Sequence, residues 1–314
     1  MKDQVDILLA TFQGELYLEE LLQSLFTQTH HSIHVIARDD GSSDNTPHIL
    51  KKWSETFPNN MTLLPTHSNL GIKGNFSELL AHSQAPYVMF ADQDDKWLPY
   101  KVEDTLNLLQ SLERQFDTHT PILVHTDLKV VDQNLKELSP SYWKYTGLYP
   151  EKTDLNDLLP QNVVTGCTIM MNQTLAKLSY PIPDQSMMHD WWVALVASCF
   201  GHIQFLNEAT ILYRQHSQND TGAQAYNFTT FTKRLFQTTN KKKRSKCNTC
   251  LQAKCLLERY DYLFQEERKK QAIARAYAGL DHLSFIKQRI SICKYHFFKH
   301  GFFRNLNFLL SRIQ

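Results

Sequence analysis

The residues most suited to chemistry form a short acidic cluster. Asp92, Asp94 and Asp95 lie within four positions, directly after the apolar run 87–91. Two carboxylates on one turn can bind a divalent cation such as Mg²⁺, and substrate phosphates and water then complete its octahedron. An ordinary acidic turn, with Asp95 capping a helix entered through Trp97, explains the same residues. The cluster alone leaves both interpretations open.

A second acidic cluster, Asp39–Asp40, follows another apolar run and leads into Gly41-Ser42-Ser43-Asp44. A carboxylate at the end of a strand can accept hydrogen bonds from a nucleobase imide or a ribose hydroxyl. A glycine-containing turn with a Ser or Asp cap is the alternative, because these residue types favour turns.

The pair His189–Asp190 stands at the start of a tryptophan-rich helical pattern. Aromatic faces beside a carboxylate, here those of Trp191 and Trp192, can hold a sugar ring. The carboxylate could then act as a general base on a hydroxyl. An aspartate that caps the helix, followed by two core tryptophans, fits the local pattern equally well.

Arg214 and His216 follow a strand-like segment at 203–213. Their side chains could pair with a diphosphate, and His216 could complete a metal site. The local pattern by itself favours a surface loop.

Three cysteines, Cys247, Cys250 and Cys255, resemble part of a zinc site. Their spacing lacks a complete set of four ligands, and they fall in a lysine-rich stretch of helical pattern. We therefore expect reduced structural thiols rather than zinc.

Positioning these groups requires strands that alternate with helices, and the chain shows this alternation. Strands are predicted at 5–11, 33–37, 61–64, 87–91, 122–127, 166–172 and 203–213, with a helix from 188. The pattern predicts an α/β domain with a mostly parallel sheet. Ligands bind beyond the carboxyl ends of the strands in such sheets, so Thr11 and the two acidic clusters should meet on one rim.

The composition limits the class of protein. The 314 residues are 42% hydrophobic and 21% charged with a formal net charge of +1, which is typical of a globular protein and gives no reason to expect nucleic-acid binding. We find no signal-peptide pattern and no apolar run long enough to span a bilayer, and the six cysteines follow no paired framework. We therefore expect a cytoplasmic protein.

The character of the sequence changes near residue 222. We expect a catalytic domain at 1–222 and a C-terminal helical module at 223–314. Within the module, 290–313 interleaves aromatic and aliphatic residues with basic ones. Such a stretch can lie on an anionic membrane surface, here the cytoplasmic face of the plasma membrane. Packing on the catalytic domain, with Lys and Arg facing water, is the alternative.

Taken in order, these segments resemble the family 2 glycosyltransferases, which have the GT-A fold. The similarity covers about residues 4–216 and rests on the series LLATFQGELYLEELLQSLFTQ, IARDDGSSDNT, NLGIKGNF, MFADQDDKWLP, TGCTIMMN and HDWW. DQDD-x-W followed by HDWW and YRQH is most similar to bacterial rhamnosyltransferase-like members. The family usually has Glu-Asp where this chain has His189–Asp190, so the role of His189 stays open.

The resemblance implies a role for each matching position. Asp92 and Asp94 correspond to the Asp-x-Asp motif, which binds Mg²⁺ or Mn²⁺ on the donor diphosphate, and Asp190 matches the catalytic base. His216 falls where the family places metal or diphosphate contacts. Contacts with the nucleotide-sugar are implied for Thr11, Asp39, Asp40, Asn69, Gly71, Asn75, Asp92 and Arg214. We expect the acceptor or sugar pocket to contain Asp95, Trp97, His189, Trp191 and Trp192.

The implied activity is inverting transfer of a sugar from a nucleotide-diphospho-sugar onto a glycan or lipid-linked acceptor in bacterial cell-surface polysaccharide synthesis. The expected donor is dTDP-rhamnose, or otherwise a UDP-hexose. One alternative is a nucleotidyltransferase that makes the activated sugar. Against it, residues 11–15 contain neither Arg nor Lys. Another is a non-catalytic scaffold, although the carboxylates that a transferase needs are all present.

Overall fold

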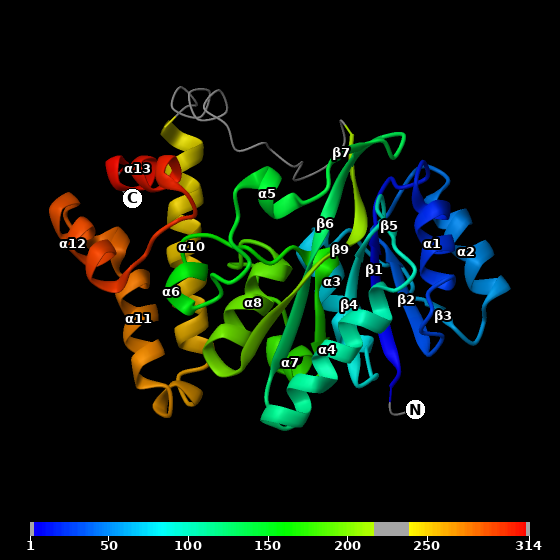
Figure 1. Ribbon diagram of the computed structural model, residues 1–314, viewed down its shortest axis with the longest axis horizontal. Helices are drawn as coiled ribbons and strands as arrows, with labels where there is room; N and C mark the ends of the chain where they lie inside the picture. Colours follow the sequence, from blue (N-terminus) through cyan, green and yellow to red (C-terminus); the bar gives the residue numbers. More distant parts are fainter. Residues whose placement is uncertain (1–2, 217–238, 312–314) are drawn as a thin grey trace.

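A mixed sheet forms the centre of the protein. The computed structural model describes residues 3–216 and 239–311, with the backbone alone at 239–247. Figure 1 shows helices around the sheet and a group of C-terminal helices at one end of the molecule. Among the described residues, the order of the nine strands is β3 (Met61–Leu63), β2 (Ile33–Asp39), β1 (Val5–Thr11), β4 (Tyr87–Asp92), β8 (Met170–Asn172), β6 (Ile122–Asp132), β9 (His202–Gln215) and β5 (Lys96–Trp97), with β7 (Glu137–Ser139) beside β6.

The N-terminal half of the sheet is parallel, as the alternation predicts. β1 pairs with both β2 and β4, and β2 pairs with β3, all in parallel. Parallel neighbours need crossover connections, and three helices provide them: α1 (Leu18–Phe26), α2 (Thr46–Thr56) and α3 (Gly71–His82). The register places Thr11 opposite Asp39 and Ala10 opposite Asp92, so the predicted polar residues end neighbouring strands.

The second half of the sheet is mixed. β8 runs antiparallel between β4 and β6, whereas the long strands β6 and β9 are parallel to each other. The predicted strand at 166–172 begins later than expected, because Gly166–Thr168 forms a 3-10 turn, η1. A hydrogen bond from the Thr168 N–H to the Thr165 carbonyl closes this turn (3.0 Å).

The side chains of β1 alternate between two hydrophobic cores. Val5, Ile7 and Leu9 pack with α1, α2 and α4 (Lys101–Phe116), whereas Leu8 packs on the other face with α3 and α8 (His189–Phe200). Because successive side chains of a strand point to opposite faces, a run that is apolar throughout must be covered on both sides.

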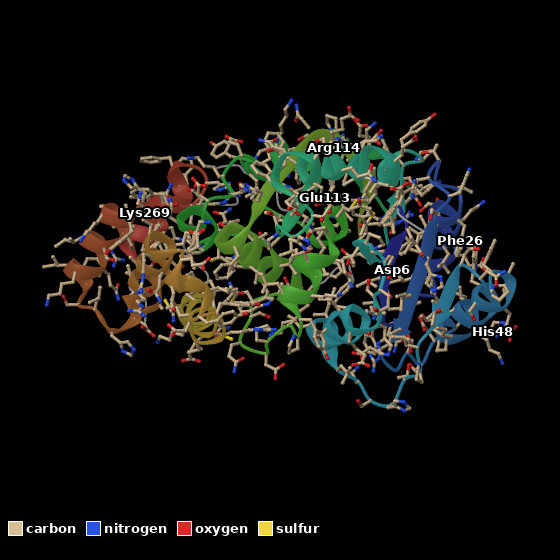
Figure 2. The ribbon with its side chains drawn as sticks, turned by 90° about the horizontal axis from the view of Figure 1, so that it is seen from below. Asp6, Phe26, His48, Glu113, Arg114 and Lys269 are labelled. Atoms are coloured by element: carbon tan, nitrogen blue, oxygen red, sulfur yellow. The ribbon has the colours of Figure 1, made fainter. Side chains whose placement is uncertain are left out.

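Asp6 is the charged residue within this buried strand. Its Oδ2 accepts hydrogen bonds from the Ser83 hydroxyl (2.8 Å) and from the N–H groups of Gln84 and Ala85 (2.9 Å each). These bonds fix the turn between α3 and β4, and the acidic cluster lies at the other end of β4. Figure 2 shows Asp6 in the region of the strands, with Lys269 at the opposite end of the molecule from His48.

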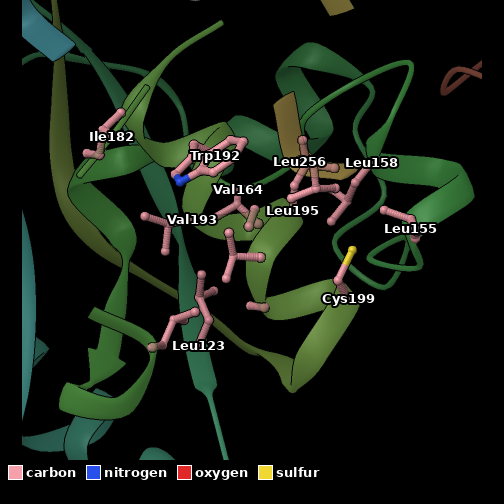
Figure 3. Packing of buried hydrophobic residues seen from close by; sticks show 14 of the residues in the cluster. Leu123, Leu155, Leu158, Val164, Ile182, Trp192, Val193, Leu195, Cys199 and Leu256 are labelled. Atoms are coloured by element: carbon pink, nitrogen blue, oxygen red, sulfur yellow. The ribbon is translucent and has the colours of Figure 1, made fainter. Parts of the chain in front are cut away.

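The C-terminal helices share a hydrophobic core with the part of the chain that contains the sheet. Cys250 and Leu256 join the cluster that contains Trp192 and Leu195, and Figure 3 shows Leu256 beside Leu158. The boundary predicted near 222 lies outside the described residues and stays a prediction.

The remaining helices of the described chain are α5 (Tyr142–Thr146), α6 (Leu155–Leu158), α7 (Gln173–Ser179), α10 (Thr239–Arg259), α11 (Arg268–Ala278), α12 (Phe285–Tyr295) and α13 (Phe302–Leu310), with the 3-10 turns η2 (Leu263–Gln265) and η3 (Leu280–His282).

Two further predictions concern this helical part. Within 3–216 and 239–311, no helix is both long enough and apolar enough to cross a bilayer. Cys250 and Cys255 are free thiols on α10, and the side chain of Cys247 lies outside the described part of the chain. The choice between zinc and reduced thiols at these cysteines therefore stays a prediction.

Candidate active site

One cavity brings most of the predicted residues together. Its volume is about 620 Å³, and it lies at the carboxyl ends of the parallel strands, facing the N-terminus of α8. A site at this edge is what an open α/β sheet leads one to expect. The predicted residues in its wall are Thr11, Asp40, Asn69, Gly71, Asn75, Asp92, Asp94, His189, Asp190 and His216.

Gln93 joins the loop after β1 to the acidic loop after β4. Its side-chain amide accepts a hydrogen bond from the Phe12 N–H and donates one to the Phe12 carbonyl, both at 2.8 Å. Gly14 permits this approach, because a Cβ there would collide with the Gln93 amide. Sequence reasoning missed both residues, although the position of Gln93 between two cavity aspartates was an available signal.

Asp39 holds its own turn instead of facing the cavity. Its Oδ1 accepts hydrogen bonds from the hydroxyls of Thr11 (3.1 Å) and Ser42 (2.5 Å), and its Oδ2 accepts from the N–H groups of Gly41 (3.0 Å) and Ser42 (2.8 Å). Gly41 has φ +91, in the left-handed region that favours glycine. The turn interpretation therefore describes Asp39 better than the predicted donor contact.

Asp40 ties β2 to the loop that precedes α3. Its carboxylate accepts hydrogen bonds from Arg38 Nη1 and from the N–H groups of Leu70 and Gly71, each at 2.8 Å. Arg38 is also buried and donates to Asn75 Oδ1 (3.1 Å). Asp40 reaches the cavity wall, but its hydrogen bonds mainly fix the loop that forms this wall.

The carboxylates of the acidic loop point in two directions. Asp92 and Asp94 line the cavity, whereas Asp95 is fully buried beneath it and accepts a hydrogen bond from the Arg214 N–H (3.3 Å). Burial, together with the negative charges of Asp94 and Asp92, raises the pKa of Asp95 well above its usual range. Asp95 is therefore not in the sugar pocket. It does not cap a helix either, because Lys96–Trp97 is a strand.

Arg214 supports the acidic loop from below, contrary to the predicted diphosphate contact. Its buried guanidinium donates to the carbonyls of Asp94 (2.9 Å) and Gln133 (2.7 Å) and to the Glu20 carboxylate (2.5 Å). It also lies 4.4 Å from the centre of the Tyr17 ring. A guanidinium held from several sides positions the loop and is not in the cavity wall.

His216 lines the cavity together with Asp92 and Asp94. Its Nε2 lies 2.8 Å from Asp94 Oδ2, and its ring centre lies 5.0 Å from that of Tyr17. The structure therefore brings His216 and Asp94 together, as the predicted metal site requires.

Asp190 lines the same cavity from the first turn of α8. We call the cavity residues of α8 the helix wall, and those at the strand ends and in the loops that follow them the strand wall. The Asp190 Oδ1 accepts a hydrogen bond from the Trp191 N–H (2.5 Å). The side chain is only partly exposed, and burial raises the pKa of Asp190 to about 7 because it disfavours the charged carboxylate. Backbone hydrogen bonds from Trp191 and Gly166 act in the opposite direction and lower this pKa. A carboxylate with a pKa near neutrality is well matched to accepting a proton from a hydroxyl.

His189 is buried beside Asp190, and neither of its ring nitrogens has a hydrogen-bond partner among the described residues. The ring stacks on Phe76 with a centroid distance of 3.9 Å and meets Phe90 edge-on at 5.0 Å. Burial lowers the pKa of His189 to about 3, so the imidazole is neutral at physiological pH. One nitrogen can then donate and the other accept a hydrogen bond.

The three predicted pocket tryptophans lie outside the cavity wall. Trp97 and Trp192 are buried in the two cores on opposite faces of the sheet, and Figure 3 shows Trp192 among aliphatic side chains. The indole N–H groups of Trp191 and Trp192 donate to the carbonyls of Leu158 (2.7 Å) and Ser179 (3.0 Å), which satisfies them within the protein. The core interpretation therefore replaces the sugar-pocket one.

The acidic wall has donors that fit a divalent cation. Asp92 and Asp94 supply carboxylate oxygens and His216 supplies an imidazole, and oxygen ligands suit Mg²⁺ or Mn²⁺. Ligand atoms of Asp92, Asp95 and Cys167 also lie within 4.8 Å of one another. A buried thiol is a poor ligand for a hard cation, so donor chemistry favours the cavity-facing set, although among the described residues it is Asp92, Asp95 and Cys167 whose ligand atoms converge within 4.8 Å.

The fold and this arrangement define a class of protein, the GT-A glycosyltransferases. A parallel half-sheet ends in paired carboxylates, and a partly buried carboxylate of α8 lines the same cavity. The model of glycosyl transferase family 2 matches residues 6–178, which is more than half of the chain. The chain therefore belongs to this family and is a glycosyltransferase.

Similarity to a curated relative points in the same direction. The chain is 26% identical over 227 residues to the dTDP-rhamnosyl transferase RfbG of Shigella flexneri, across 68% of this chain and 74% of that protein. It spans 59% to 66% of the length of several other curated relatives that it matches. The substrates and partners of those whole proteins are therefore a matter for proposal.

Solved structures agree on the fold. The S. aureus TarS 1-349 structure in complex with UDP has a TM-score of 0.55 at 17% identity, over 93% of this chain and 91% of that one. The mannosyltransferase PcManGT of Pyrobaculum calidifontis, in complex with GDP-Man and Mn²⁺, has a TM-score of 0.53 at 15% identity, over 92% and 73%. At these identities the likeness shows the fold alone.

Proposed function

We propose that this glycosyltransferase takes a sugar from a nucleotide-diphospho-sugar and transfers it, with inversion, onto a hydroxyl of a glycan or lipid-linked acceptor. The observation that carries the proposal is a single cavity lined by Asp92 and Asp94 from the end of β4 and by Asp190 from the first turn of α8. A diphosphate leaving group and an acceptor hydroxyl need these groups on opposite sides of the anomeric carbon.

The nucleoside would lie in the part of the cavity between β1 and α3. Thr11, Asn69, Gly71 and Asn75 belong to this part of the wall. The carboxylate of Asp40 accepts from the Gly71 N–H, and the Asn69 amide donates to the Asp40 carbonyl (2.8 Å), so the loop is already shaped. A preformed wall lowers the conformational entropy that donor binding costs.

The donor diphosphate would lie at the acidic loop, where Asp92, Asp94 and His216 would hold Mg²⁺ or Mn²⁺. The bound cation would neutralise charge on the diphosphate as it leaves. The Mn²⁺ in the Pyrobaculum enzyme complex supports a divalent cation. Gln93 and Arg214 would keep the acidic loop in place, through the bonds to Phe12 and Asp94 described above.

Asp190 would act as the general base. Its carboxylate removes the proton from the acceptor hydroxyl, and the hydroxyl oxygen attacks the anomeric carbon from the face opposite the nucleotide. The bond between the anomeric carbon and the diphosphate oxygen breaks, its electron pair leaves with the diphosphate, and the configuration inverts. The pKa of about 7 supports this role, because a base works best when its pKa is near the working pH.

L-Rhamnose from dTDP-rhamnose is our choice of sugar, supported by the similarity to the Shigella dTDP-rhamnosyl transferase. A UDP-hexose is the second choice, supported by the fold similarity to a UDP-bound structure. Polysaccharide synthesis at the bacterial cell surface is the corresponding process, and the Bacillus subtilis relative TuaG, named for teichuronic acid biosynthesis, supports it at 25% identity.

A donor screen with and without EDTA tests these proposals. We expect hydrolysis or transfer with dTDP-rhamnose, lost on chelation and restored by Mg²⁺ or Mn²⁺. Preference for a GDP- or CMP-sugar would overturn the donor assignment. Metal-dependent donor binding without transfer to any added acceptor would favour a scaffold, and synthesis of the nucleotide-sugar itself would favour a nucleotidyltransferase.

A further inference from the structure

The outer side of α13 is an exposed apolar stripe that takes no part in the cavity. Phe302, Leu306 and Leu310 recur at every fourth position and therefore share one side of the helix. Their exposed fractions are 72%, 37% and 67%. Phe308, on the opposite side, is buried in the protein core, so α13 packs with one face and presents another apolar face to solvent.

A similar stripe lies on α12. Ile286 and Ile290 are 71% and 61% exposed and lie one helical turn apart, whereas Ile292 is buried in the core. Lys287 and Lys294 are exposed beside this stripe and stand seven residues apart, so they share a side of the helix. Long lysine side chains next to apolar residues can keep their ammonium groups in a polar layer.

Hydrogen bonds connect the two helices at one end of the molecule. The Arg289 guanidinium donates to the carbonyls of Phe308 (3.3 Å), Leu309 (2.6 Å) and Ser311 (2.5 Å) at the C-terminal end of α13. Figure 1 shows α12 and α13 at the end of the molecule farthest from α1 and α2. α12 and α13, each with an exposed apolar stripe, thus lie together at one end of the molecule.

The charge of this segment indicates what covers the surface. Residues 282–314 contain six Lys and Arg residues and no Asp or Glu, although the whole chain has 33 basic and 32 acidic residues. Residues 1–281 therefore hold 27 basic and 32 acidic residues and carry a net charge of −5. A second copy of the segment would bring a like charge, whereas an anionic lipid surface complements both the charge and the apolar stripes.

We propose that α12 and α13 dock on an anionic phospholipid bilayer. The side chains of the two stripes, Phe302, Leu306, Leu310, Ile286 and Ile290, enter the interfacial layer, and Lys287 and Lys294 face the headgroup phosphates. Each lysine near an anionic membrane surface strengthens binding about fivefold. This docking goes beyond the proposed transfer reaction, because it uses no residue of the cavity.

Co-sedimentation of the full chain with vesicles tests the docking surface. We expect binding to phosphatidylglycerol–phosphatidylcholine vesicles to be at least about tenfold stronger than binding to pure phosphatidylcholine vesicles. Two double variants that remove apolar side chains, Ile286→Ser with Ile290→Ser and Phe302→Ser with Leu310→Ser, should each lower binding about tenfold or more. The charge variant Lys287→Glu with Lys294→Glu should lower it by a similar factor.

A matched control separates the surface from net charge. Lys51→Glu with Lys177→Glu makes the same change in net charge at exposed positions of α2 and α7, and should leave vesicle binding within about twofold. Donor turnover without vesicles should be unchanged in every variant. That result separates a failure of the docking proposal from a failure of the proposed reaction.

Equal binding of wild type and apolar variants, or equal binding to anionic and neutral vesicles, would overturn the proposal. Sedimentation without vesicles tests the second copy as the occupant. If the apolar variants convert a dimer into a monomer and leave vesicle binding unchanged, the surface joins two copies and the proposal is wrong.

Discussion

The strand wall and the helix wall of the cavity both contain buried polar side chains, but they differ in whether the hydrogen bonds of these side chains are already made within the protein. On the strand wall, Asp40 is buried and its carboxylate is occupied by Arg38 and by two backbone N–H groups. On the helix wall, Asp190 has a pKa raised to about 7, and both ring nitrogens of His189 lack partners among the described residues. A polar group whose hydrogen bonds are already made within the protein stabilises the fold. A polar group with an unused donor or acceptor can bind a substrate.

The largest effect is expected at Asp190. Asp190→Asn should lower transfer about 1,000-fold, because it removes the group that takes the acceptor proton. Donor binding should change little. Single-turnover transfer and donor titration measure the two effects. Asp157→Asn is the matched control, since Asp157 is also partly buried with a raised pKa but lies outside the cavity wall, and it should keep wild-type turnover.

The same variant should not lose stability. In the folded protein the pKa of Asp190 is raised from about 4 to about 7, so the ionised form is the costly one. Asn resembles the protonated acid. The unfolding free energy of Asp190→Asn should therefore exceed that of the wild type by a margin that opens between about pH 4 and pH 7 and stays constant above. Denaturant unfolding at pH 4 and pH 8 measures it, and a less stable variant at pH 8 would contradict the account.

On the strand wall we expect substitution of an aspartate to lower the stability of the fold. Asp40→Asn leaves the charge of Arg38 buried without its counter-ion and should lower the free energy of unfolding by about 3–5 kcal/mol. Thermal or urea unfolding measures the loss. Asp184→Asn, at an exposed position, should stay within about 0.5 kcal/mol of the wild type. Wild-type stability of Asp40→Asn would show that Asp40 does not hold the loop.

Two buried histidines sharpen the comparison. His189 and His125 are both buried and both have a pKa lowered to about 3 by burial, but of these two only His189 lies in the cavity wall. His189→Phe should lower donor kcat/KM roughly tenfold, the cost of about one hydrogen bond to a ligand hydroxyl. His125→Phe should leave kcat/KM unchanged. Equal losses in the two variants would assign His189 a packing role only.

The sequence predicts much of the fold, because apolar runs and helical spacing report burial directly. It also predicts the rim, because strands that run in parallel end at one edge. It does not predict where a side chain at that edge points. Asp127 ends another apolar run, yet its carboxylate accepts hydrogen bonds from Ser141, Tyr142 and Trp143 and so organises α5.

The acidic cluster shows what long-range pairing adds. Asp94 and Asp95 are adjacent, but only Asp94 faces the cavity. Asp95 turns into the core because the next two residues, Lys96–Trp97, pair with Leu212 and Ile211 of β9, more than 100 residues later in the sequence. The core tryptophans of α8 follow the same logic, because their partners on α6 and α7 cannot be deduced from local spacing.

The dependence of kcat/KM on pH tests most directly whether Asp190 is the base. Since the carboxylate must be ionised to accept a proton, and its pKa is raised to about 7, transfer should fall about tenfold per pH unit below 7 and level off above it. Unfolding and donor binding, measured over the same pH range, would show whether the fall in kcat/KM below pH 7 comes from protonation of Asp190 or from loss of the fold. A rate that is flat between about pH 5.5 and 7, or that rises toward acid, would contradict the account.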